Sequence, residues 1–73
     1  MAILRYAVVI EKAPSSYAAY APDLPGCIAT DSTVTEAESL IREAIEFHLE
    51  GLKADGLPIP PSSSRVEYVD IPA

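Results

Sequence analysis

The chain has 73 residues, of which eleven are acidic and five basic, and its formal net charge at pH 7 is -6. We expect one domain, residues 1–73, with a thin core, because so small a domain buries only about 60% of its unfolded surface. The single cysteine excludes an internal disulfide, and one cysteine with one histidine cannot supply the four ligands of a structural zinc site.

The acidic charge balance bears on partners and location. Nucleic-acid binding depends on Lys and Arg, so direct binding to DNA or RNA is not expected, whereas a basic protein is a suitable partner. Charge appears at Arg5 after a short apolar run, which is not a secretion signal, and no apolar run approaches the roughly 20 residues of a membrane span. We therefore expect a cytoplasmic protein with no membrane contact.

Three short strands are predicted in the first part of the chain. Residues 3–11 are rich in β-branched and aromatic side chains and lack Gly and Pro, and a turn follows them. Residues 17–21 and 27–30 form the second and third predicted strands, which are stopped by Pro22 and by Asp31. The short loops between them predict an antiparallel meander.

The first predicted strand has two unlike faces. Its even positions from Leu4 to Ile10 are uniformly apolar and are expected to face a helix. The odd positions Ile3, Ala7 and Val9 form a half-apolar face that no second helix in this sequence covers. We interpret this face, or a sheet edge, as a surface for a partner or a second copy; scattered apolar surface residues are the alternative.

A long helix is predicted to follow Thr33. Thr33 is a suitable N-cap, and Glu36 stands three residues later, where it completes a capping box. Apolar residues then recur at helical spacing and form one buried stripe: Ala37, Leu40, Ile41, Ala44, Ile45, Leu49 and Leu52. The helix is predicted to end at Asp55-Gly56, because glycine accepts the left-handed conformation of a helix end and three prolines follow.

The C-terminal part of the chain is predicted to be extended. Residues 57–64 are rich in proline, which holds the residue before it in extended conformations, so this segment is interpreted as a stiff connector. The segment from Arg65 to Ile71 repeats the β-branched chemistry of the first strand and is predicted to be a fourth strand, with Pro72 blunting its end. The predicted fold class is α+β, in the order β-β-β-α-β.

The residues that most often carry chemistry form no catalytic pattern. His48 falls within the apolar stripe of the helix, and we interpret it as a packed residue, with a pH-sensitive or partner-contacting imidazole as the alternative. Cys27 has no basic neighbour in sequence to lower its pKa, which favours a buried, unreactive thiol. Glu67 and Asp70 stand at an odd and an even position of the predicted last strand, so their side chains point to opposite faces and do not converge on one metal site. We therefore predict a protein that is not an enzyme and holds no metal or cofactor.

The loop Pro22-Asp23-Leu24-Pro25-Gly26 is stiff, because its two prolines fix φ and Gly26 accepts a positive φ. A stiff loop loses little entropy on binding, so Asp23 and Leu24, taken as exposed, are predicted partner contacts; an ordinary strand connector is the alternative.

The helix carries the other predicted contacts. Glu43, Glu46 and Glu50 lie opposite the apolar stripe and offer an acidic surface to a basic partner. A solvated helix face without a binding role is the alternative interpretation.

Several motifs in order resemble one protein family. They are Tyr20-Ala-Pro-Asp-Leu-Pro-Gly-Cys27, then Asp31-Ser-Thr-Val-Thr-Glu-Ala37, an Arg-Glu-Ala-Ile helix segment and the exit Gly56-Leu-Pro-Ile-Pro60. Together they resemble the HicB-like antitoxins, and the match covers almost the whole chain. The resemblance implies a partial RNase H-like fold of three strands, a helix and a fourth strand.

The resemblance also implies a function. HicB-like antitoxins pair with HicA toxins, small basic ribonucleases that cleave mRNA, and inhibit them by covering the active site. Many members add a C-terminal DNA-binding segment, and this sequence reaches Ala73 without one. We predict an antitoxin-like binding module that forms a homo-dimer or higher homo-oligomer. The alternatives are a solitary HicB-like protein with another regulatory role and a residual RNase H-like, metal-dependent nuclease.

Overall fold

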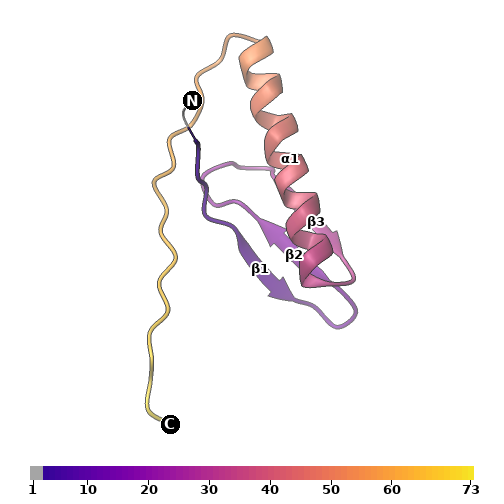
Figure 1. Ribbon diagram of the computed structural model, residues 1–73, viewed down its shortest axis with the longest axis vertical. Coiled ribbons are helices and arrows are strands. Elements are labelled where there is room, and N and C mark those ends of the chain that lie inside the picture. The colour runs from indigo at the N-terminus through magenta and orange to yellow at the C-terminus, as the bar shows by residue number, and fades with distance from the viewer. Residues whose placement is uncertain (1–2) are drawn as a thin grey trace.

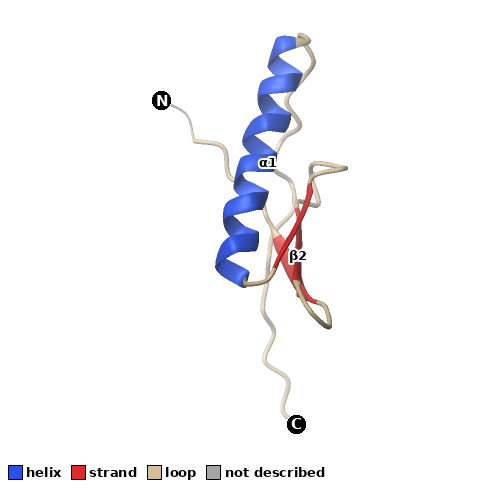
Figure 2. Cartoon of the chain, turned by 90° about the vertical axis from the view of Figure 1, so that its right-hand side faces the viewer, coloured by secondary structure: helices blue, strands red, loops and turns tan. Residues whose placement is uncertain are grey.

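The computed structural model describes residues 3–73, which form a three-stranded sheet with one long helix lying across it (Figure 1). The strands are β1 (Val9–Lys12), β2 (Tyr17–Tyr20) and β3 (Ile28–Asp31), and the helix is α1 (Val34–Ala54). The strand order is β1-β2-β3, and both pairings are antiparallel. Seen from the side, α1 covers one face of the sheet (Figure 2). The predicted α+β class and the antiparallel meander are confirmed.

The first strand is shorter than predicted. Its register places Val9 opposite Tyr20 and Lys12 opposite Tyr17. Because β2 ends at Tyr20, the residues before Val9 face the β2–β3 loop, whose Pro22 has no N–H to donate to a ladder. Residues 3–8 therefore run alongside the sheet without joining it.

The core lies between α1 and the sheet and is thin, as predicted. Its buried members are Ala19, Ala21, Leu24, Cys27, Ala37 and Ile41. Tyr6, Val8 and Ile10 pack against this cluster, which confirms that these even positions face the helix, whereas Leu4 at the end of the row is exposed. Four of the six buried residues are Ala or Cys, so the few large side chains carry a large share of the buried apolar surface.

Both ends of α1 are capped at the predicted residues, but the Glu36 carboxylate accepts the hydroxyls of Thr33 and Ser32 and not the Thr33 backbone N–H that a capping box would use. The hydroxyl oxygen of Thr33 accepts the backbone N–H of Glu36 at 3.1 Å, and the same hydroxyl donates to the Glu36 carboxylate at 3.1 Å. At the other end, Gly56 has a φ of 68° and its N–H donates to the carbonyl of Lys53, while the N–H of Leu57 donates to Leu52. This pair of bonds satisfies two of the carbonyls that a helix end leaves free.

The C-terminal segment corrects one prediction. Arg65 to Ile71 is extended but forms no strand with this chain's sheet. Figure 1 shows it running past β1 and away from the rest of the molecule. The radius of gyration is 14.0 Å, compared with about 11 Å for a compact chain of this length. The β-branched sequence favours extended backbone, but a strand also requires an edge within hydrogen-bonding distance, and this segment has none beside it.

Candidate functional site

The β2–β3 loop, residues 21–27, is a tight turn held by its own backbone. The N–H of Leu24 donates to the carbonyl of Ala21 at 3.1 Å, and the N–H of Cys27 donates to the carbonyl of Leu24 at 3.1 Å. Gly26 has a φ of 87°, a conformation that other residues rarely adopt, so its predicted role in the turn is confirmed. These bonds fix the direction in which each side chain of the loop points.

Leu24 points into the protein, and the exposure expected for it is wrong. Its side chain is 0% exposed and belongs to the cluster beneath α1 that also contains Cys27 and Ile41. The physical reason is the curvature of the turn, which directs one apolar side chain inward to fill a core that otherwise consists largely of alanines. Leu24 would have to leave the core to touch a partner.

Asp23 ties the loop to the C-terminal segment. Its carboxylate accepts four hydrogen bonds, from the backbone N–H groups of Ser63 and Ser64 at 2.9 and 3.0 Å and from their hydroxyls at 3.0 and 2.8 Å. The hydrogen bond from the Ser64 N–H is the largest of the effects that lower the pKa of Asp23 to about 2. We call this arrangement of Asp23, Ser63 and Ser64 the serine clamp. Its carboxylate is engaged within the chain.

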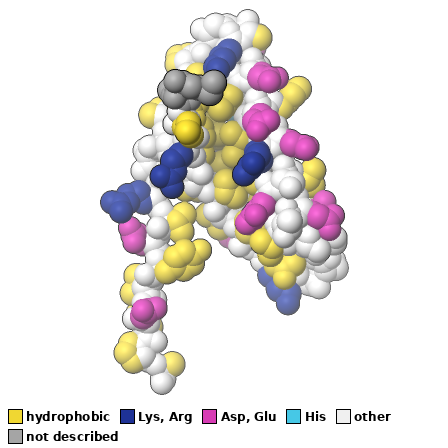
Figure 3. Space-filling view, viewed as in Figure 1, with side chains coloured by type: hydrophobic (Ala, Val, Ile, Leu, Met, Phe, Trp, Pro, Cys, Tyr) yellow, Lys and Arg dark blue, Asp and Glu magenta, His cyan; other side chains and the backbone are white. Residues whose placement is uncertain are grey.

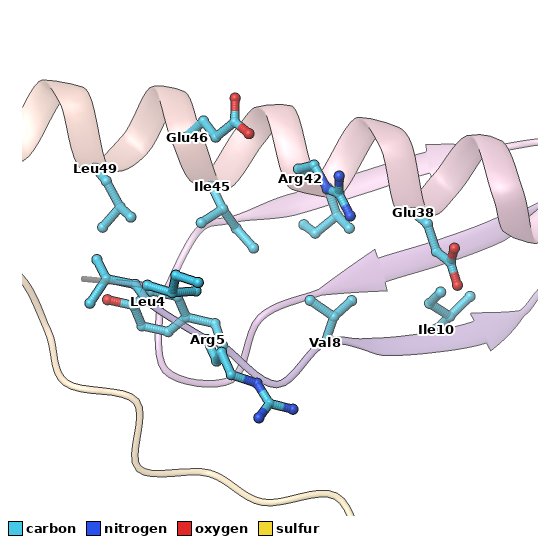
Figure 4. Close-up of a pocket in the computed structure, with 12 residues that line it drawn as sticks. Leu4, Arg5, Val8, Ile10, Glu38, Arg42, Ile45, Glu46 and Leu49 are labelled. Carbon is cyan, nitrogen blue, oxygen red and sulfur yellow. The ribbon is translucent and has the colours of Figure 1, made fainter. Parts of the chain in front are cut away.

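The three predicted glutamates are all exposed on α1, and Figure 3 shows acidic side chains gathered along the helix. Their spacing of three and four residues places them in one row on the helix surface. Glu46 lies with Arg42 on the side toward the N-terminal segment (Figure 4). Glu43 and Glu50 lie four residues before and three residues after Phe47, so they are its neighbours on the helix surface. Asp23 is bonded to Ser63 and Ser64, and within residues 3–73 no hydrogen bond links it to any of the three glutamates.

Phe47 is a surface residue that the sequence interpretation missed. It is 79% exposed, an unusual state for so large an apolar side chain, and it borders a hollow of about 440 Å³ beside β3. Ile28, from the edge strand β3, lines the same hollow and is 66% exposed. We call Phe47, Ile28, Glu43 and Glu50 the Phe47 patch. The sequence did contain a signal, because Phe47 interrupts the polar face of the helix outside the predicted apolar stripe.

A groove runs on the opposite side of α1, between the helix and residues 3–10. It has a volume of about 680 Å³ and an apolar floor that includes Val8, Ile45 and Leu49. Arg5 and Arg42 stand among these side chains (Figure 4). We call it the α1–β1 groove, and it lies beside the edge of β1 that faces away from β2.

Cys27 is placed as the sequence predicted, whereas the position of His48 fits both interpretations made of it. Cys27 is buried, its Sγ lies 3.9 Å from the carbonyl oxygen of Ala44, and burial raises the pKa of its thiol, which keeps it protonated and unreactive. His48 is half-buried at the hollow of the Phe47 patch. Residues 3–73 contain no group of three or more His, Cys, Asp or Glu arranged to hold a metal ion. Among those same residues, no helix is long and apolar enough to span a bilayer.

Comparison with known proteins decides the family. The sequence model of the HicB-like antitoxins of bacterial toxin-antitoxin systems matches residues 6–72. The chain belongs to this family. The match confirms the resemblance that the loop, the Thr33-to-Glu36 helix start and the proline exit carry.

Relatives of this HicB-like chain occur in phage and bacteria. It is 37% identical over 67 residues to an uncharacterized 14.9 kDa protein of Haemophilus phage HP1, a match that spans 92% of this chain and 50% of that protein. A UPF0150 protein of Synechocystis is 37% identical, over 94% of this chain and 89% of the relative. A UPF0150 protein of Helicobacter pylori is 45% identical over 67% of this chain and 68% of that relative. The chain thus spans half the length of the phage protein.

A solved structure shares the fold. A chain of the HicA3 and HicB3 toxin-antitoxin complex superposes on this HicB-like chain with a TM-score of 0.68 and 30% sequence identity. The match covers 81% of this chain and 70% of that one. The arrangement of three antiparallel strands and one long helix is therefore the fold of a known toxin-antitoxin protein.

Proposed function

We propose that this HicB-like chain neutralises a small basic HicA-type toxin, a ribonuclease that cleaves mRNA, by binding it and covering its active site. The observation that carries the proposal is the structural match to a chain of the HicA3 and HicB3 complex. The net charge of -6 supports it, because opposite charges accelerate the encounter of two proteins. The proposed location is the cytoplasm, where mRNA is translated and such a toxin acts.

The Phe47 patch is the proposed contact surface. Aromatic residues often dominate the affinity of an interface when polar residues around them exclude water. Phe47 is such a residue, with Glu43 and Glu50 beside it to meet basic side chains of the toxin. Glu46 extends the acidic surface toward the other side of α1. Asp23 contributes by holding the β2–β3 loop in place, and direct contact of its carboxylate with the toxin would compete with the serine clamp.

The test is co-expression with a basic HicA-type protein encoded beside this chain. The toxin alone is expected to arrest growth, and co-expression is expected to restore it through a complex that survives purification. Rescue without a complex, or no rescue, contradicts the proposal.

Substitutions then locate the surface. Phe47→Ala is expected to weaken toxin binding by at least tenfold, since a central aromatic contact is worth about 2 kcal/mol or more. Ile3→Ala is the matched control, because Ile3 is 83% exposed but lies away from the patch. Glu43→Gln with Glu50→Gln is expected to slow association and to reduce its dependence on salt. Equal effects of Phe47→Ala and Ile3→Ala would place the contact elsewhere.

A further inference from the structure

The segment from Arg65 to Ile71 exposes apolar side chains that a folded monomer normally covers. Tyr68 is 92% exposed, Val69 75% and Ile71 76%, and the backbone of this segment forms no ladder with the chain's own sheet. An extended apolar segment with free N–H and C=O groups readily pairs with another sheet edge. This segment therefore requires a partner surface.

The α1–β1 groove has the matching properties. The edge of β1 that faces away from β2 is unpaired, and the apolar floor of the groove lies beside it. Within residues 3–73 the structure contains one ion pair, Arg65 with Glu67 at 3.0 Å, so neither Arg5 nor Arg42 has a carboxylate within salt-bridge distance. The apolar side chains of the segment match the apolar floor of this groove. The rim carries Glu38 and Glu46 as well as Arg5 and Arg42, so the match rests on apolar surface and the free β1 edge and not on net charge.

The lengths also agree. Seven extended residues span roughly 23 Å at about 3.3 Å each. The groove extends along α1 from Glu38 to Leu49, which is roughly 16 Å at about 1.5 Å per residue. One segment is long enough to fill one groove.

The serine clamp determines which copy supplies the segment. Asp23 holds Ser63 and Ser64 at the β2–β3 loop, and beyond this point the chain leaves the domain (Figures 1 and 2). The longest dimension of the chain, 49 Å, compared with 27 and 22 Å for the others, reflects this projection. In this structure the segment is held at its base and directed outward, away from its own β1 edge, which leaves it open to a neighbouring molecule.

We propose that residues 65–71 of one copy dock in the α1–β1 groove of a second copy as an added strand along β1, and that the two copies exchange these segments reciprocally. Such a two-fold exchange leaves no segment and no groove unoccupied. It uses the side of α1 opposite to the Phe47 patch, and of the proposed toxin contacts only Glu46 lies at the rim of the groove. A dimer formed in this way carries two Phe47 patches.

The oligomeric state tests the proposal. Light scattering on the full chain at micromolar concentration is expected to give the mass of a dimer, and Val69→Asp is expected to give a monomer, because it places a charge in the apolar groove. Phe47→Asp is the matched control, since Phe47 is exposed to a similar extent but lies outside the groove, and it is expected to remain a dimer. A monomeric wild type, or a Val69→Asp variant with unchanged mass and circular dichroism, overturns the proposal.

Cross-linking shows whether residues 65–71 dock on a second copy or on β1 of their own chain. In a Cys27→Ser background, one copy carries Val8→Cys, which lies in the groove, and a second copy with a different tag carries Val69→Cys. A short bismaleimide is expected to join the two differently tagged copies after mixing. If instead only a single chain that carries both cysteines becomes cross-linked internally, the segment folds onto its own β1 and the exchange is excluded.

Discussion

The backbone N–H of Ser64 donates a 3.0 Å hydrogen bond to the carboxylate of Asp23, although the two residues are 41 positions apart in the chain. The bond joins the β2–β3 loop to the connector that follows α1. It therefore fixes both the position of the loop and the direction in which the C-terminal segment leaves the domain. Two of the predictions below rest on this relationship.

Removal of the Asp23 carboxylate is expected to free the connector. In Asp23→Ala the N–H groups of Ser63 and Ser64 lose their acceptor, so their amide exchange should become much faster while exchange in α1 stays unchanged. Hydrogen exchange followed by NMR measures this. Asp31→Ala is the control, because the Asp31 carboxylate is bonded to the adjacent Ser32 and holds no distant segment. Unchanged exchange at Ser64 in Asp23→Ala would show that the clamp does not hold the connector.

The clamp is also expected to depend on pH in a defined direction. Hydrogen bonds from Ser64 and Ser63 hold the pKa of Asp23 at about 2, below its ordinary value of 3.8. A group whose pKa is lowered by folding stabilises the folded state fully above its unfolded pKa, and this contribution disappears as the pH falls toward the folded pKa. The clamp should therefore persist at neutral pH and weaken between about pH 4 and pH 2. The chemical shift of the Ser64 amide reports this, and a midpoint near 4 would contradict it.

The N-cap of α1 is expected to stabilise the protein measurably. Thr33→Ala removes the oxygen that accepts the Glu36 N–H, and loss of such a cap typically costs about 1 kcal/mol of unfolding free energy. Denaturation in urea measures the change. Thr33→Ser should retain most of the stability because it keeps the hydroxyl. Thr35→Ala, an exposed change in the first turn of the same helix, is the matched control and should differ little from the wild type.

Leu24→Ala is expected to destabilise the fold rather than to remove a contact with a partner. Leu24 is fully buried, and truncation of a buried leucine costs about 2–5 kcal/mol. Urea denaturation should therefore show a large loss of stability for Leu24→Ala and almost none for the exposed change Phe47→Ala. Wild-type stability combined with weakened toxin binding in Leu24→Ala would restore the original interpretation of Leu24 as a surface contact.

The helix shows how far local sequence determines structure. The cap at Thr33 and the glycine at position 56 predicted both ends of α1 correctly, because capping uses groups only a few residues apart. The interpretation of the β2–β3 loop was correct in the same local sense, since the positive φ of Gly26 follows from the Pro-Gly sequence. The expectation that the Leu24 side chain is exposed was wrong, because burial depends on which other segments pack against the loop, here α1.

The sequence by itself determined the fold class, the extent of the helix, the positions of the strand turns and the family. Each of these follows from short-range chemistry or from the order of motifs along the chain. Only the tertiary structure decided that Leu24 is in the core, that Asp23 binds Ser63 and Ser64, and that Phe47 stands exposed between Glu43 and Glu50. It also decided that Arg65 to Ile71 leaves its own sheet unpaired. The physical reason is that burial, distant hydrogen bonds and strand pairing depend on which segments lie side by side, and a pattern within one segment does not specify its neighbour.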